Sequence, residues 1–129
     1  MRHQSNWVDG AYQTPTKEQI LVINPATEAS IATIDSTPLE TVNSIISSSL
    51  QNFSSGVWSR ADASARFMVL SKAANLLRSR LPEFVALETE QTGRPIREMR
   101  AQLSRIPEWL EYFASLTRTH EGRDRKSVV

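Results

Sequence analysis

Cysteine is absent from the 129 residues of this chain, and histidine is nearly absent. Without cysteine the chain can form no disulfide, no thiolate metal ligand and no thiol nucleophile. His3 and His120 are the only histidines. They offer no cluster with metal-ligand spacing, and neither has a partner in a recognisable catalytic triad pattern. We expect both histidines to lie on the surface.

Glycine and long apolar runs are also scarce. Gly10, Gly56, Gly93 and Gly122 lie too far apart for a phosphate-binding loop, which needs its glycines within one strand-to-helix turn. No apolar run approaches the roughly 20 residues that span a bilayer, and residues 1–10 lack the apolar segment of a signal peptide. The 15 basic and 14 acidic residues nearly cancel. The composition therefore predicts a soluble cytoplasmic protein with no nucleic-acid or membrane partner.

The first part of the chain has the pattern of short strands, within a length that fits one domain. Aromatic residues flank Asp9-Gly10, which predicts a hairpin across residues 7–13. Apolar runs at residues 20–23 and 31–34 predict two further strands. The Asn24–Thr27 segment between them predicts a turn, because its proline cannot continue a strand ladder.

From Thr37 the apolar period changes from 2 to 3.6, which predicts helices. Thr37 as a cap, Pro38 at the first helical position and Glu40 three residues after the cap predict where the first helix begins. We expect this helix to end near Gly56. Its apolar face consists of Val42, Ile45, Ile46, Leu50 and Phe53.

Three more helices are predicted: one from about Ala63 to Arg80, a short one from Pro82 to Gly93, and one that begins after Pro95 and kinks at Pro107. The last has an apolar spacing of 3.5, which favours core packing over an independent coiled coil. We expect Trp7, Trp58 and Trp109 to cap the core. The inward residues predicted are Phe67, Leu70, Ala74, Leu77 and Leu81, then Phe84, Val85 and Leu87, then Ile96, Met99, Leu103, Ile106, Leu110 and Phe113.

The charged side chains indicate solvated helix faces rather than a site. Glu88 and Glu90 diverge on a helix, and with Arg94 nearby they predict an ion-paired helix end instead of an acid/base pair. Acidic residues interleave with the later arginines, which favours ion pairs over an anion site. The residues by themselves predict no catalytic, coenzyme-binding or metal-binding site in this chain. These later charges are Arg94, Arg97, Arg100 and Arg105, with Glu98, Glu108 and Glu111.

Several segments resemble, in the same order, the beginning of the aldehyde dehydrogenase superfamily. The similarity covers about residues 7–123. The chain departs from the family pattern at residues 2–5, where Phe-Ile-x-Gly is typical, and at Glu28-Ala29, where Gly-Glu is typical. The matching segments are Trp7-Val8-Asp9-Gly10, Ile23-Asn24-Pro25-Ala26-Thr27, Phe53-Ser54-Ser55-Gly56-Val57-Trp58-Ser59, Leu87-Glu88-Thr89 to Thr92-Gly93-Arg94-Pro95, and Trp109-Leu110-Glu111-Tyr112-Phe113-Ala114.

The resemblance implies an α/β family fold in which this chain is mostly α-helical, with a small N-terminal β unit. Residues 1–123 correspond to an incomplete N-terminal part of the coenzyme-binding domain. Residues 124–129 begin with three charged residues where the family enters an apolar strand. We therefore predict that 124–129 is a non-family tail and disordered.

The resemblance also implies the chemistry of the parent family, which is aldehyde oxidation with NAD or NADP. A cysteine thiolate attacks the aldehyde, an Asn helps to hold the oxyanion, and a Glu activates the water that hydrolyses the thioester. All of these residues fall beyond position 129 in the family pattern. The chain is thus expected to be a truncated, inactive portion with no catalytic or coenzyme-binding residue.

A weaker implication concerns a monovalent cation that some family members hold with main-chain oxygens. The matching positions are Ile23 and Gln91, but at least one further ligand lies downstream, so no complete metal site is expected here. An alternative function is a small helical interaction module that binds full-length aldehyde dehydrogenase subunits. A small enzyme that uses Glu and Arg residues is a third reading, opposed by the lack of any convergent group of such residues.

Overall fold

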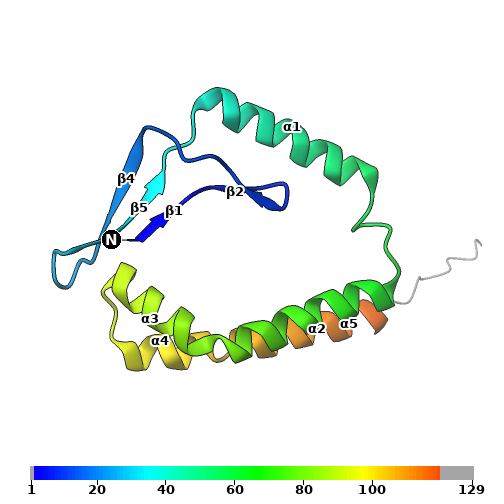
Figure 1. Ribbon diagram of the computed structural model, residues 1–129. Coiled ribbons are helices and arrows are strands. Elements are labelled where there is room, and N and C mark those ends of the chain that lie inside the picture. Colours follow the sequence, from blue (N-terminus) through cyan, green and yellow to red (C-terminus); the bar gives the residue numbers. More distant parts are fainter. Residues whose placement is uncertain (1, 120–129) are drawn as a thin grey trace, which may run out of the picture.

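The computed structural model describes residues 2–119, which form a small β unit, a separate helix α1 and a layer of four helices (Figure 1). Strands β2 (Trp7–Val8) and β3 (Ala11–Tyr12) pair antiparallel. The turn between them has positive φ at Asp9 (50°) and Gly10 (83°), the backbone that two-residue hairpin loops favour. The predicted hairpin is confirmed.

A three-stranded sheet forms the rest of the β unit, in the order β1-β5-β4. Strands β4 (Gln19–Ile23) and β5 (Ser30–Asp35) pair antiparallel, which confirms both predicted strands. Strand β1 (Arg2–Gln4) pairs parallel to β5. This strand was not predicted, because its three polar residues carry no apolar alternation.

The predicted turn after β4 is confirmed. The Asn24 side-chain oxygen accepts a hydrogen bond from the Ala26 amide at 2.9 Å, and the Glu28 amide donates to the Asn24 carbonyl at 2.8 Å. Glu28, which stands where the family pattern has glycine, adopts a positive φ of 59°. A residue with a Cβ atom pays a steric cost in this conformation that glycine does not.

Helix α1 (Leu39–Ser55) begins differently from the prediction. Pro38 occupies the cap position with no side-chain cap hydrogen bond, so the predicted capping role of Thr37 is wrong. The Thr37 hydroxyl instead accepts a hydrogen bond from the Asn6 side chain at 2.7 Å, which ties the helix entry to the β unit. The predicted end is confirmed, because Gly56 terminates the helix with φ 73°.

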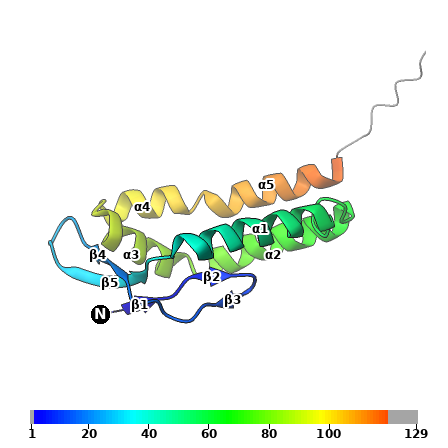
Figure 2. The ribbon, with the colours of Figure 1, turned by 90° about the horizontal axis from the view of Figure 1, so that it is seen from above.

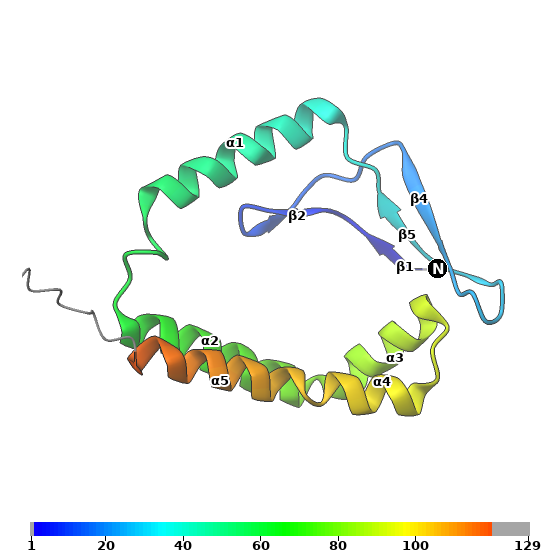
Figure 3. The same ribbon diagram turned by 180° about the vertical axis from the view of Figure 1, so that it is seen from behind.

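Helices α2 (Ala63–Ser79) and α5 (Ile106–Thr119) run side by side over most of their length (Figures 2 and 3). Ala74 and Ala114 are fully buried at their contact, because small side chains let the two helix backbones approach closely. The Arg118 guanidinium lies 3.7 Å from the centre of the Phe67 ring. The predicted stripe is confirmed within α2, where Ala74 is buried and Phe67, Leu70 and Leu77 are half-buried. Leu81, also half-buried, is the first residue of the next helix.

Helices α3 (Leu81–Thr92) and α4 (Ile96–Leu103) form a second packed pair, joined by a turn at Gly93. Val85 and Met99 supply its buried core. Phe84 and Leu87 are exposed, so their predicted inward placement is wrong. Leu87 borders a cavity between α3 and the sheet rather than a packed core.

Between α4 and α5 the helix breaks at residues 104 and 105, a stronger disruption than the predicted kink. Pro107, fully buried, is the second residue of α5, where its missing N–H costs no hydrogen bond. Ile96 and Phe113 are exposed, contrary to prediction, whereas Met99 is buried and Leu103, Ile106 and Leu110 are half-buried as predicted.

Two further expectations concern the tryptophans and membranes. Trp7, Trp58 and Trp109 are all exposed rather than capping the core, because no second layer lies over the elements that carry them. No helix within residues 2–119 is long and apolar enough to cross a membrane. The predictions for His120 and for the tail at 124–129 concern residues outside the described range.

Candidate functional site

The most polar buried cluster lies on one face of the sheet, around Asp35. Alternate residues of a strand share a face, so Thr33 and Asp35 project together from β5. The parallel register places His3 of β1 opposite Thr33. The His3 Nδ1 atom lies 3.1 Å from the Thr33 hydroxyl, and His3 Nε2 lies 3.4 Å from the Asp35 carboxylate and 3.4 Å from the Ser5 hydroxyl.

This arrangement does not form a Ser-His-Asp triad. A triad needs the carboxylate and the nucleophile on opposite ring nitrogens, but Asp35 and Ser5 share Nε2 of His3. Thr33 lies on the other nitrogen, yet it stands in the middle of the central strand. The β5 backbone is used for pairing with β1 and β4, so it has no N–H groups at Thr33 to stabilise an oxyanion.

Asp35 instead anchors the β unit. Its side chain is fully buried, one carboxylate oxygen accepts a hydrogen bond from the Thr16 amide at 3.2 Å, and the other oxygen has no hydrogen-bond partner. Thr16 also donates from its hydroxyl to the Ser36 carbonyl at 3.0 Å. The cluster thus holds β1 and the segment before β4 onto β5. Its only signal in the sequence is an acidic residue at the end of an apolar strand.

The two positions implied for a monovalent cation come from segments that the fold brings together. Ile23 ends β4 and Gln91 lies in the last turn of α3. Pro25, two residues after Ile23, packs its ring against Gly93, two residues after Gln91. The contact is so close that a Cβ atom on Gly93 would lie 2.7 Å from Pro25 Cγ. Among residues 2–119, no group of three His, Asp or Glu side chains could hold a metal ion.

The charged residues of α3 and α4 form exposed pairs. Glu90 forms an ion pair with Arg2 at 3.0 Å, and the Glu88 carboxylate accepts a hydrogen bond from the Gln91 side chain at 2.6 Å. Arg94 lies 3.8 Å from Glu98. Glu90 is therefore ion-paired, but with Arg2 rather than with Arg94 as the prediction had it, and the ion pairs found within residues 2–119 include none of Glu88.

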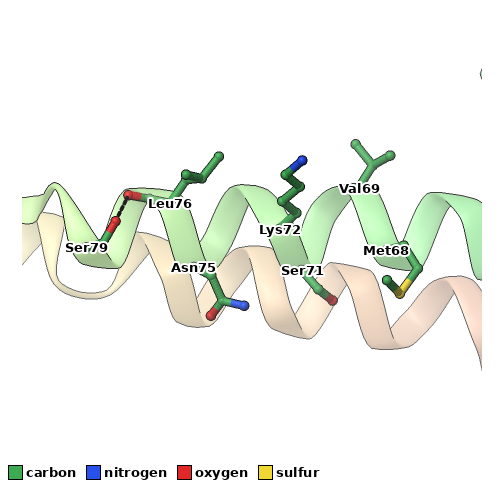
Figure 4. A pocket seen from close by; sticks show the side chains of 7 residues that line it. All are labelled: Met68, Val69, Ser71, Lys72, Asn75, Leu76 and Ser79. Atoms are coloured by element: carbon green, nitrogen blue, oxygen red, sulfur yellow. Dashed lines mark hydrogen bonds between the residues drawn. The ribbon is translucent and has the colours of Figure 1, made fainter.

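The surface depressions also carry little chemistry. A cavity of about 260 Å³ lies between the sheet and α3 and is lined by residues that include Arg2, His3 and Gln91. A larger, open depression of about 610 Å³ runs along α2 (Figure 4). Its side chains Val69, Lys72 and Leu76 point away from α5. No carboxylate or histidine is among the residues that line it.

Comparison with known sequences identifies the family of the chain. The pattern of the aldehyde dehydrogenase family matches residues 12–128. This range includes residues 124–128, for which we predicted a sequence outside the family. Betaine aldehyde dehydrogenase of Bacillus subtilis is 32% identical over 127 residues, which are 98% of this chain and 26% of the relative. The (Z)-2-((N-methylformamido)methylene)-5-hydroxybutyrolactone dehydrogenase of Acinetobacter baylyi is 36% identical over 100 residues, 78% of this chain and 20% of the relative.

Solved structures share the fold. A double mutant of betaine aldehyde dehydrogenase from Staphylococcus aureus, in complex with NAD+ and with a BME-modified cysteine, superposes with a TM-score of 0.90 at 26% identity. The match covers 98% of this chain and 26% of that one. An NAD-dependent aldehyde dehydrogenase from Sinorhizobium meliloti has a TM-score of 0.90 at 20% identity, over 100% of this chain and 26% of that one.

The chain therefore spans about a quarter or less of the length of these relatives. The order of its elements, the match over residues 12–128 and the superposition of nearly the whole chain agree with one another. This chain belongs to the aldehyde dehydrogenase family.

Proposed function

We propose that this chain is the N-terminal portion of the coenzyme-binding domain of an NAD(P)-dependent oxidoreductase that oxidises aldehydes to carboxylic acids. The observation that carries the proposal is the family match over residues 12–128. The superposition on a relative that binds NAD+ supports NAD as the coenzyme of the parent enzyme. A cytoplasmic location stays a prediction of the sequence.

The role of these residues in that enzyme is structural. Thiolate attack on an aldehyde needs a cysteine, and the chain contains none. A dinucleotide site needs a glycine-rich strand-to-helix turn with free backbone N–H groups. The strand-to-helix connection within residues 2–119, from β5 to α1, is Ser36-Thr37-Pro38. It has no glycine, and Pro38 has no N–H, so the described residues do not fit NAD.

The first test is turnover by the purified chain. We expect no NADH or NADPH formation above a buffer blank with a panel of aldehydes, and no saturable binding of either coenzyme by calorimetry. Turnover above the blank by the chain alone would disprove its structural role.

The second test is a chimera in which residues 2–119 replace the matching N-terminal segment of the Bacillus subtilis betaine aldehyde dehydrogenase. We expect the chimera to be soluble and to reduce NAD with betaine aldehyde, because the family fold should accept a segment of the same architecture. The parent enzyme is the positive control. A soluble, folded chimera without NAD reduction would contradict the proposed function.

A second candidate function, binding to aldehyde dehydrogenase subunits in trans, is favoured by one observation. Helix α1, which the structure describes in full, has no buried residue, and its apolar side chains Ile46, Leu50 and Phe53 are exposed. An apolar helix face left in solvent is typical of a surface that binds protein. Co-purification of the chain with full-length subunits tests this candidate.

A further inference from the structure

Strand β1 differs from β4 and β5 in what holds it to the fold. Its residues Arg2, His3 and Gln4 are all polar and all exposed. The pairing with β5 that the structure describes covers three residues, is parallel and lies at the edge of the sheet. Parallel pairing is slightly less stable per residue than antiparallel pairing, and segments with few buried apolar contacts open most easily. The attachment of β1 therefore depends on its side chains.

The side chains of Arg2 and His3 project to opposite faces of the sheet, because side chains alternate along a strand. On one face the Arg2 guanidinium forms an ion pair with Glu90 of α3 at 3.0 Å. The two side chains are 65% and 39% exposed. An exposed pair of this kind adds little stability and is screened by salt, so we expect the stronger hold on the other face.

On that other face, His3 lies over the buried carboxylate of Asp35. The Asp35 side chain is fully buried, its Oδ1 atom accepts a hydrogen bond from the Thr16 amide at 3.2 Å, and its Oδ2 atom has no hydrogen-bond partner. A buried carboxylate is costly unless another group compensates its charge. His3 is the basic side chain that reaches it, with Nε2 at 3.4 Å from Oδ1.

The chain is fixed again from Asn6 onward. The Asn6 side chain donates a hydrogen bond to the Thr37 hydroxyl at 2.7 Å, and its carbonyl accepts one from the Gln13 amide at 2.8 Å. Ser5 lies between β1 and this anchor. A change of the backbone dihedrals at Ser5 can therefore move β1 without moving the hairpin that follows.

Strand β1 also forms one wall of the cavity of about 260 Å³ between the sheet and α3, because all three of its residues line that cavity. Movement of β1 away from β5 opens this cavity. It also frees the pairing edge of β5, and a free edge can accept another extended segment. The apolar side chains that line the cavity are Val22, Ile31, Ala32, Ile34 and Leu87.

We propose that residues 2–5 form a hinged strap, which opens about Ser5 while the rest of the fold stays intact, and that the contact of His3 with Asp35 holds it closed. In the closed state the imidazole lies over the carboxylate, and in the open state water takes its place. Neither state therefore leaves the Asp35 charge buried alone, which keeps the two states close in free energy. The proposal goes beyond the proposed function and does not depend on it.

Amide exchange with water, followed by NMR on the full chain of 129 residues, measures opening of the strap. The readouts are the amides of residues 2–4 and those of residues 32–34 that face β1, with the α2 amides as the reference for global unfolding. His3→Gln removes the imidazole but keeps a polar side chain. We expect it to raise exchange at the strap about tenfold or more and to leave α2 unchanged. Arg2→Gln, the matched control on the exposed face, should raise it less than about fivefold.

Two further variants test the contact itself. In an Asp35→Asn background the carboxylate charge is gone, so His3→Gln should change exchange at the strap less than about twofold. A disulfide gives an independent measurement, because the chain has no cysteine of its own and Gln4 is the register partner of Ile34. The oxidised Gln4→Cys/Ile34→Cys chain should slow exchange of the β5 amides about tenfold or more and abolish the effect of His3→Gln.

Each other outcome counts against the proposal. Equal effects of His3→Gln and Arg2→Gln, or an effect of His3→Gln that persists beside Asp35→Asn, would show that the contact with Asp35 does not hold the strap. Acceleration of the α2 amides by His3→Gln, or wild-type strap amides that exchange as slowly as those of α2, would show that the strap does not open by itself. If Asp35→Asn disturbs the α2 amides, the disulfide variant decides, and a His3→Gln effect that survives the disulfide overturns the proposal.

Discussion

Replacement of Gly93 by alanine should weaken the contact between the helical layer and the β unit. Gly93 ends α3 with φ 71°, a conformation that costs an L-residue about 1–2 kcal/mol. A Cβ atom there would also lie 2.7 Å from Pro25 Cγ, whereas carbon atoms prefer about 3.5–4.0 Å. The ring must move by roughly 1 Å, and overpacking of this kind costs about 1–3 kcal/mol. We expect Gly93→Ala to lower the free energy of unfolding by about 2–5 kcal/mol.

Gly10→Ala is the matched control for the backbone cost alone. Gly10 has φ 83°, and a Cβ atom there would meet nothing within 4 Å, so we expect a loss of only about 1–2 kcal/mol. Urea denaturation followed by far-UV circular dichroism measures both variants. A third comparison, Gly93→Ala in a Pro25→Ala background, should recover the clash part of the loss, since the ring that is struck is then absent. Equal losses at Gly10 and Gly93, or no recovery in the double variant, would refute the steric explanation.

Three further substitutions test the packing, the strained turn and a helix cap. Ala114→Leu should lower the free energy of unfolding by about 1–3 kcal/mol in urea denaturation, because Ala114 is fully buried against α2; a loss no greater than for Ser115→Leu would contradict this. Glu28→Gly should raise the thermal midpoint, since it relieves a positive φ of 59° at a gain of up to about 1 kcal/mol; an unchanged or lower midpoint would argue against strain. Asp62→Ala should cost about 0.5–2 kcal/mol because the Asp62 carboxylate accepts the Ala65 amide at 2.7 Å at the start of α2. Asp62→Asn, which keeps an acceptor, should lose much less by the same denaturation.

Local signals in the sequence predicted the features that depend on neighbouring residues. The Asp9-Gly10 hairpin, the Asn24–Thr27 turn and the glycine ends at Gly56 and Gly93 all follow from backbone conformations that few residues tolerate. Strand β1 could not be predicted in this way. Its three residues are polar, and it exists because β5 offers a free edge and because His3 and Arg2 reach Asp35 and Glu90.

The Asp35 cluster was missed for the same reason. His3 and Asp35 are 32 positions apart in the sequence, and only the parallel pairing of β1 with β5 brings the imidazole to the carboxylate. Thr37 does not cap the helix because Pro38 takes the cap position, and the Thr37 hydroxyl accepts a hydrogen bond from the Asn6 side chain. A capping pattern in the sequence shows that a hydroxyl is available as an acceptor. Which donor it binds depends on the tertiary structure.

Helix α5 shows why apolar periodicity alone could not predict burial. A spacing of 3.5 through residues 96–113 assumes one continuous helix, but α4 ends at Leu103 and α5 begins at Ile106. The side of α5 that meets α2 is then set by Pro107, Leu110 and Ala114, and Phe113 turns away from it.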